Sequence, residues 1–210
     1  MRGAFVQIPD HSSICSPLDA DTVASLPEAL VTSAPLGVQA KDVDVVTAAW
    51  RARGVSLGCQ ARLTVLSLDR LRARVRPKGT PRLADSTDRP LLRSWFDRFR
   101  ERHPEDRSHI EFVVDQPLAE GGVVVWEVDG HAVAMASRTP EVAGMVRMGL
   151  AFQPTAGTTY ADAAFDFACV EAARTAEHVL VLSGAADCAA YLSRGFIPAL
   201  DRVVLQVLAG

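Results

Sequence analysis

The second half of the chain alternates short apolar runs with turn residues. Val123–Val128 and His131–Arg138 both read as strands, and Asp129-Gly130 between them is a strong signal for a tight hairpin turn. Met145–Phe152 is a third apolar run of strand length. A short strand at residues 82–84 precedes them. The pattern predicts antiparallel hairpins in this part of the chain.

Apolar residues at helical spacing predict helices before and after these strands. Pro90 lies in a first turn, and apolar residues then recur every three or four positions to about residue 103: Leu91, Leu92, Trp95, Phe96 and Phe99. Residues 103–116 can hold a second short helix. An alanine-rich helix is expected over 160–175, followed by a buried strand, His178–Ser183, and a short helix that carries Tyr191 and stops at Gly195-Phe196.

The first half is less regular. Residues 1–20 read as loop or short extended segments, 21–32 and 41–53 as helices, 34–37 as a turn and 60–68 as a strand. Residues 70–78, here called the basic segment, carry five cations. They form either a phosphate or nucleic-acid patch or a solvated linker, and we favour the linker because acidic residues elsewhere cancel the charge. Pro77, Gly79 and Pro81 predict a boundary here, giving an N-terminal region 1–77 and a domain 78–210.

Composition narrows the class of protein. The 210 residues are 49% apolar and 22% charged, which suits one or two soluble globular domains, and the net charge of −3 argues against a nucleic-acid binder. No apolar run is long enough for a membrane span, and the first residues do not resemble a signal peptide. The four cysteines are scattered without C-x-x-C spacing, so we expect reduced thiols, no metal site and a cytoplasmic protein.

Four local motifs, in this order, resemble the Gcn5-related N-acetyltransferase (GNAT) superfamily. Residues 82–99 are similar to the opening "R-x-A-x-x-x-D-x-x-L-L-x-x-W-x-x-x-F", and 128–137 to the hairpin "dG-x-x-v-a-m-a". Residues 150–154 lie where the family has a "V-Y-T-P" strand end, and 189–196 resemble the late "lY-x-x-x-GF" motif. The resemblance covers residues 79–207 well and 36–71 loosely. It is closest to bacterial members with an extra N-terminal half, which here could be a degenerate copy of the GNAT C-terminal half.

The resemblance implies a mixed α/β fold whose central sheet splays into a V, and an acyl-CoA-dependent N-acyltransferase that acetylates a small-molecule amine. The family would place pantetheine of acetyl-CoA along the strand at Leu150, Ala151 and Phe152. The pyrophosphate would bind the next loop and helix start at Ala156, Gly157, Thr158, Thr159 and Tyr160. Tyr191 would protonate the leaving thiolate, Glu127 would relay a proton from the amine, and Trp95 and Phe96 would line the acceptor cleft.

The loop departs from the family pattern, which reads roughly "P-E-H-R-G-R-G-Y-A". Both loop arginines are replaced, by Ala156 and Thr158, and one glycine becomes Thr159. Each lost charge-assisted contact is worth roughly 1.5–3 kcal/mol. Thr159 and Asp162 also have the spacing of a capping box, which would occupy amides that a phosphate needs, and Asp166 adds a further negative charge.

Two classes of function therefore stay open. The first is the acyltransferase. The second is a GNAT-fold protein that has lost coenzyme A binding and acts as a binding or regulatory module, or runs other chemistry in the same cleft. Each proposed site residue has a structural alternative: Tyr191 as a packing aromatic, Glu127 as a solvent-facing strand residue, and Trp95 and Phe96 as core residues.

Overall fold

A computed structural model describes residues 5–6, 13–16, 19–29, 35–156 and 159–208. The chain divides into two compact units. The first unit comprises residues 1–66, 182–192 and 198–210, and the second comprises 67–181 and 193–197. The C-terminal segments thus return to the first unit. The expected domain boundary at residue 77 stays a prediction.

The first unit is a sheet with two helices on it. Its strands lie in the order β1-β2-β3-β10-β4, with bounds Phe5–Val6, Ser13–Cys15, Leu36–Gln39, Phe196–Val207 and Leu57–Leu68. β2 and β3 are parallel, and β3 and β10 are antiparallel. Helices α1 (Ala20–Ala29) and α2 (Val43–Arg51) supply Leu26, Val46 and Trp50 to a core shared with Val38 and Leu205.

One expectation about the first unit is wrong. The turn predicted at 34–37 is instead the start of β3 at Leu36 and Gly37, and Ala34 lies outside the described residues. β10 pairs with this strand over four residues, Val204 opposite Gly37. A partner some 165 residues away therefore overrides the local turn signal of Pro35 and Gly37.

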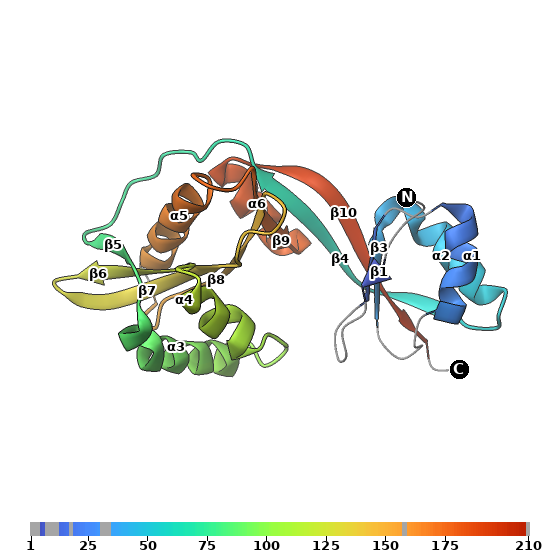
Figure 1. The fold of residues 1–210 in the computed structure, drawn as a ribbon, viewed down its shortest axis with the longest axis horizontal. Coiled ribbons are helices and arrows are strands. Elements are labelled where there is room, and N and C mark those ends of the chain that lie inside the picture. The colour runs from blue at the N-terminus through green and yellow to red at the C-terminus, as the bar shows by residue number, and fades with distance from the viewer. Residues whose placement is uncertain (1–4, 7–12, 17–18, 30–34, 157–158, 209–210) are drawn as a thin grey trace. The chain divides into compact units, whose positions relative to one another are not determined.

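The second unit is a sheet between two helices. Its strands lie in the order β9-β8-β7-β6-β5, with bounds His178–Ser183, Met145–Phe152, His131–Arg138, Val123–Val128 and Thr80–Leu83. β5 to β8 pair antiparallel, whereas β8 and β9 are parallel. Helix α3 (Arg89–Arg102) lies on one face of this sheet and α5 (Tyr160–Ala172) on the other (Figure 1). A π-helical turn, Glu111–Asp115, lies within residues 103–116, where a second short helix was expected, and α4 (Gln116–Ala119) follows it directly.

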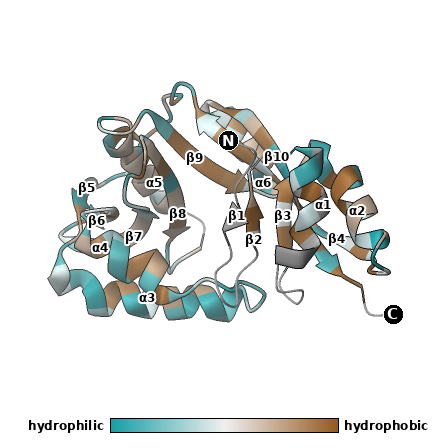
Figure 2. Ribbon diagram, turned by 45° about the vertical axis from the view of Figure 1, so that its right-hand side comes forward, coloured by the Kyte–Doolittle hydropathy of each residue, from teal (hydrophilic) through white to brown (hydrophobic). Residues whose placement is uncertain are grey.

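The two helices pack in different ways. α3 alternates hydrophobic and hydrophilic positions along its length (Figure 2) and buries Leu92 against Val123, Val125 and Met135. α5 meets the sheet through alanines at every fourth position, Ala164, Ala168 and Ala172, all fully buried. Small side chains let this helix approach the strands closely, which explains the alanine-rich sequence.

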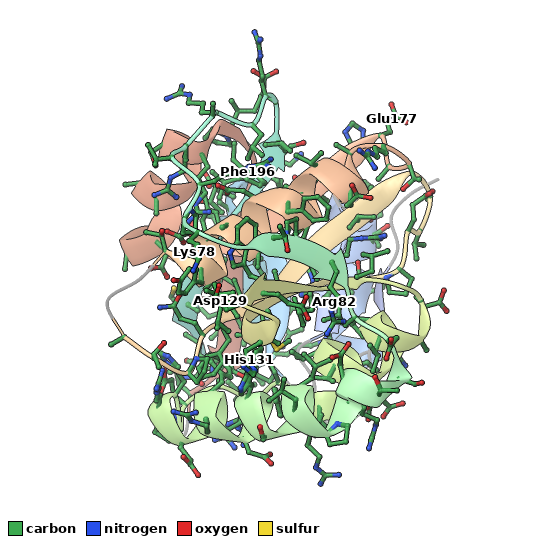
Figure 3. All side chains as sticks on the ribbon, turned by 90° about the vertical axis from the view of Figure 1, so that its left-hand side faces the viewer. Lys78, Arg82, Asp129, His131, Glu177 and Phe196 are labelled. Atoms are coloured by element: carbon green, nitrogen blue, oxygen red, sulfur yellow. The ribbon has the colours of Figure 1, made fainter. Side chains whose placement is uncertain are left out.

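Local signals in the sequence correspond to specific contacts. Asp129 and Gly130 adopt φ of 52° and 78°, as a two-residue hairpin turn requires, and Lys78 forms an ion pair with Asp129 at 2.8 Å (Figure 3). Asp85 and Asp88 form a capping box ahead of α3. The strands at 123–128, 131–138, 145–152 and 178–183 agree with the sequence pattern, and the α/β fold class is confirmed. Among the described residues, no helix combines the length and the apolarity needed to cross a membrane.

Candidate functional site

Strands β8 and β9 separate part-way along their length. Their parallel pairing joins Met145 to His178, Val146 to Val179 and Arg147 to Leu180. β8 then continues for five residues, from Met148 to Phe152, beyond the last of these pairs. The sheet of the second unit therefore splays here, as the resemblance implied. One edge of β8 stays on β7 while the other loses its partner strand, leaving backbone groups available for a ligand.

A bulge lies in the part of β8 that pairs with β7 but no longer with β9. The β7–β8 register shifts between Ala136 and Arg138, which oppose Ala151 and Met148, so β8 carries one extra residue there. Ser137 is buried, with 1% of its surface exposed, and its hydroxyl accepts a hydrogen bond from the Leu150 amide at 3.1 Å. The Leu150 N–H is thus turned toward β7, on the side away from the open edge of β8.

The three predicted pantetheine residues differ in exposure. Ala151 is exposed, Leu150 is half-buried, and Phe152 is buried, with 6% of its surface exposed. Gly149 and Ala151 share the exposed face of β8, and a Cβ at Gly149 would lie 2.6 Å from the Ser137 hydroxyl. The missing side chain at Gly149 thus makes room for β7, and the free part of β8 presents its backbone and the methyl group of Ala151, which suits a ligand that lies along it.

Two arginines of α3 hold the end of β8. Arg98 and Arg102 both donate to the Pro154 carbonyl, at 3.0 and 2.7 Å, and the Arg102 guanidinium lies 5.2 Å from the centre of the Phe152 ring. These residues were not predicted as site residues. Their i, i+4 spacing on the polar side of α3 is the signal that places them side by side.

The start of α5 corrects the predicted capping box. Thr159 makes no side-chain capping hydrogen bond. Gln153 instead accepts from the Ala161 amide at 2.9 Å and donates to the Thr155 carbonyl at 2.7 Å, closing the loop on itself. Of the predicted loop residues, Ala156 and Thr159 are exposed and Tyr160 is half-buried, while Gly157 and Thr158 lie outside the described residues.

Asp162 and Asp166 point to a buried arginine. Arg194, only 8% exposed, donates to both carboxylates, to Asp166 at 2.7 Å, and stacks 5.1 Å from the centre of the Phe165 ring. Burial acts to lower the pKa of Arg194, but the two carboxylates raise it. Burial in turn raises the pKa of Asp166 against the opposing effect of Arg194. One of the two negative charges at the start of α5 is thus balanced within the second unit, and the helix start repels an incoming anion less than the sequence indicated.

Glu127 is part of an ion-pair network. Arg82 donates to Glu127 at 2.7 Å and binds Asp88 through both terminal nitrogens at 2.6 and 2.8 Å. Hydrogen bonding to Arg82 lowers the pKa of Asp88, which is 9% exposed and also accepts from the Asp85 amide. This network gives the "R-x-A-x-x-x-D" opening a structural role, since its arginine and aspartate join β5 to the start of α3.

The other predicted residues fall in two settings. Trp95 and Phe96 are 3% and 4% exposed and belong to the core under α3. Tyr191 is half-buried on α6 (Ala185–Arg194), in the part of this helix that belongs to the first unit. The roles of these three residues and of Glu127 in a reaction stay predictions.

Comparison with solved structures identifies the fold. A GCN5-related N-acetyltransferase from Kribbella flavida aligns with a TM-score of 0.66 and 15% identity over 95% of this chain and 82% of its own. A GNAT-family acetyltransferase from Colwellia psychrerythraea gives a TM-score of 0.62 with 9% identity over 99% and 81%, and a GCN5-related N-acetyltransferase from Sphaerobacter thermophilus gives 0.59 with 13% over 98% and 76%. The sequence matches no family model and no curated protein. The architecture and the splayed strands together give this chain the fold of the GCN5-related N-acetyltransferases.

Proposed function

We propose that the protein is an acyl-CoA-dependent N-acyltransferase that transfers an acetyl group to a small-molecule amine. The observation that carries the proposal is the separation of β8 from β9 after Arg147 and Leu180. A parallel sheet that opens at this point keeps one strand edge free for the amide groups of an extended ligand. The likeness in fold to acetyltransferases supports the reaction class but names no acceptor.

The residues present fit coenzyme A along β8 better than on the loop before α5. β8 offers its free edge, with no side chain at Gly149 and only a methyl group at Ala151. The loop has Ala156 where the family has an arginine, so its contribution rests on backbone groups and on the Thr159 hydroxyl, which no capping bond occupies. Bound there, the cofactor supplies the activated acetyl thioester.

In the proposed reaction the amine nitrogen attacks the acetyl carbonyl, the new C–N bond forms and the C–S bond breaks. Tyr191 would give its phenolic proton to the departing thiolate, since a phenol is protonated at neutral pH. Glu127 would accept the proton released by the amine, directly or through water. Its contact with Arg82 keeps that carboxylate oriented but occupies one of its oxygens, Oε1.

The alternative is a GNAT-fold protein without coenzyme A binding. Two observations favour it: Ala156 and Thr158 stand where the family has the two loop arginines, and Glu127 is already paired with Arg82. A binding module would need neither a cationic loop nor a free base.

Calorimetric titration of the full chain with acetyl-CoA separates these functions. The acyltransferase predicts saturable heat below millimolar cofactor, and release of free thiol when a panel of small primary amines is added. Tyr191→Phe should then lower kcat by about 100-fold or more with little change in KM for acetyl-CoA. Absence of heat at millimolar acetyl-CoA would rule out the enzyme and support the alternative.

A further inference from the structure

A cavity of about 470 Å³ lies within the second unit, between the basic segment and α5. Residues 71–77 form one wall. The other wall is a single face of the helix, lined by Thr159, Asp162, Ala163, Asp166, Phe167 and Val170. This volume is in the range of small-molecule sites. Of the residues predicted to hold the cofactor, Thr159 lines it.

The basic segment is anchored at both ends. The Arg70 and Arg72 amides donate to the carbonyls of Gly195 and Arg194, at 3.3 and 2.9 Å. The indole of Trp126, 1% exposed, donates to the Lys78 carbonyl at 3.0 Å. The segment crosses α5 on the way to β5 (Figure 1). Its two ends are therefore held in place, and residues 72–76 between them are exposed, in agreement with the solvated linker favoured from the sequence.

Positive charge exceeds negative charge among the lining residues. Arg72, Arg74 and Arg76 line the cavity, against the carboxylates of Asp162 and Asp166. Both carboxylates already bind the buried Arg194. The lining arginines therefore outnumber the carboxylates, and the cavity has a net positive charge, as an anion site requires.

One of these arginines makes a contact that an anion could replace. Arg74 lies 3.5 Å from Asp162, and their side chains are 42% and 40% exposed, so the pair is loose and solvated. Two oxygens of a phosphate group would accept shorter, bidentate hydrogen bonds from Arg74. The aliphatic and aromatic residues farther along the helix face, Phe167 and Val170, give an apolar surface beside the cations.

We propose that this cavity binds the phosphate groups of a nucleotide, and that the basic segment supplies the arginines that the loop before α5 lacks. Under the proposed function, on which this identification of the ligand rests, the nucleotide is the 3′-phosphorylated ADP half of coenzyme A. A free nucleotide has the same chemistry and is the other source. Asp162 holds Arg74 until the phosphate replaces it.

The test uses the full chain and four probes: acetyl-CoA, its analogue lacking the 3′-phosphate, adenosine 3′,5′-bisphosphate and inorganic phosphate. Arg74→Ala should weaken binding of the bisphosphate about tenfold, and Arg74→Ala with Arg76→Ala further still. Arg93→Ala, an exposed arginine of α3 that does not line the cavity, is the matched control and should leave binding unchanged. Asp162→Asn should strengthen binding severalfold, because it removes a competing charge and releases Arg74. Thermal melts check that each variant is folded. Because Arg74→Ala should weaken binding and Asp162→Asn should strengthen it, a general loss of stability cannot explain both results.

The outcomes distinguish this site from the proposed function. Equal affinity of acetyl-CoA for wild type and for the double arginine variant overturns the cavity proposal and leaves the acyltransferase intact. Binding of the bisphosphate that depends on Arg74, without binding of acetyl-CoA, supports a site for a free nucleotide and overturns the acyltransferase. Weaker binding of the analogue lacking the 3′-phosphate, with the difference abolished in the double variant, identifies the cofactor as the ligand. Failure of all four probes to bind overturns both.

Discussion

Replacing Arg194 by methionine tests how the acidic start of α5 is stabilised. The side chain of Arg194 is 10% exposed and binds Asp166, 19% exposed, and Asp162, 40% exposed. Removing one partner of a buried ion pair costs about 3–5 kcal/mol, because the remaining charge is left without compensation. Solvent screens Asp162, so most of the cost comes from Asp166. We expect Arg194→Met to lower the free energy of unfolding by about 3 kcal/mol.

The pH dependence of this loss follows from Asp166. Burial raises the pKa of Asp166 above its ordinary value of 3.8, so its contribution to stability is complete below that value and declines as pH rises through the raised pKa. In Arg194→Met the counter-charge is gone and the pKa rises further. The difference in stability between the two proteins should therefore shrink as pH falls from about 7 toward 4.

Urea denaturation followed by tryptophan fluorescence measures both effects, since Trp95 and Trp126 report on the second unit. Asp166→Asn placed in the Arg194→Met background should recover at least about 1 kcal/mol, whereas Asp166→Asn alone should be destabilising. A loss below about 1 kcal/mol, or one that is constant from pH 4 to 7, would contradict the reasoning.

Three further substitutions test other contacts. Gly195→Ala should lower the free energy of unfolding, measured by urea denaturation, by at least about 2 kcal/mol. The reason is that φ at this position is +98° and a Cβ would lie 1.9 Å from the Arg70 carbonyl oxygen of the basic segment. A near-neutral result would mean that the segment is not fixed there. Ser137→Ala should cost about 1–3 kcal/mol in thermal unfolding, because the Leu150 amide loses its acceptor. Unchanged stability would contradict this role of the Ser137 hydroxyl. Arg82→Gln should cost about 1–2 kcal/mol at pH 7. Because Arg82 lowers the pKa of Asp88, this loss should begin to shrink as pH falls below the ordinary value of 3.8 and should vanish only below the lowered pKa. A loss that persists at still lower pH would refute the pairing.

Local pattern was enough for the elements whose neighbours are close in sequence. The hairpin turn depends on the positive φ that Asp129 and Gly130 readily adopt, and the amphipathic face of α3 depends on the spacing of its apolar residues. Both signals lie within a short stretch of sequence. β3 was missed because its pairing with β10 is long-range and the signals of Pro35 and Gly37 are typical of a turn.

The candidate site was predictable only in outline. The position of the strand that opens from its neighbour followed from the order of motifs. The contacts within it did not, because they join residues far apart: Ser137 binds the Leu150 amide, and Gln153 takes the place predicted for Thr159 at the helix start. The contact between Arg74 and Asp162 could not be read from a run of alternating arginines, since it depends on where the basic segment crosses α5.

A crystal structure of the protein grown with excess coenzyme A tests the central claim most directly. The account predicts that pantetheine lies along Met148–Phe152, on the edge of β8 from which β9 has separated. Density for coenzyme A elsewhere on the protein, or a bare β8 edge at saturating cofactor, would contradict it.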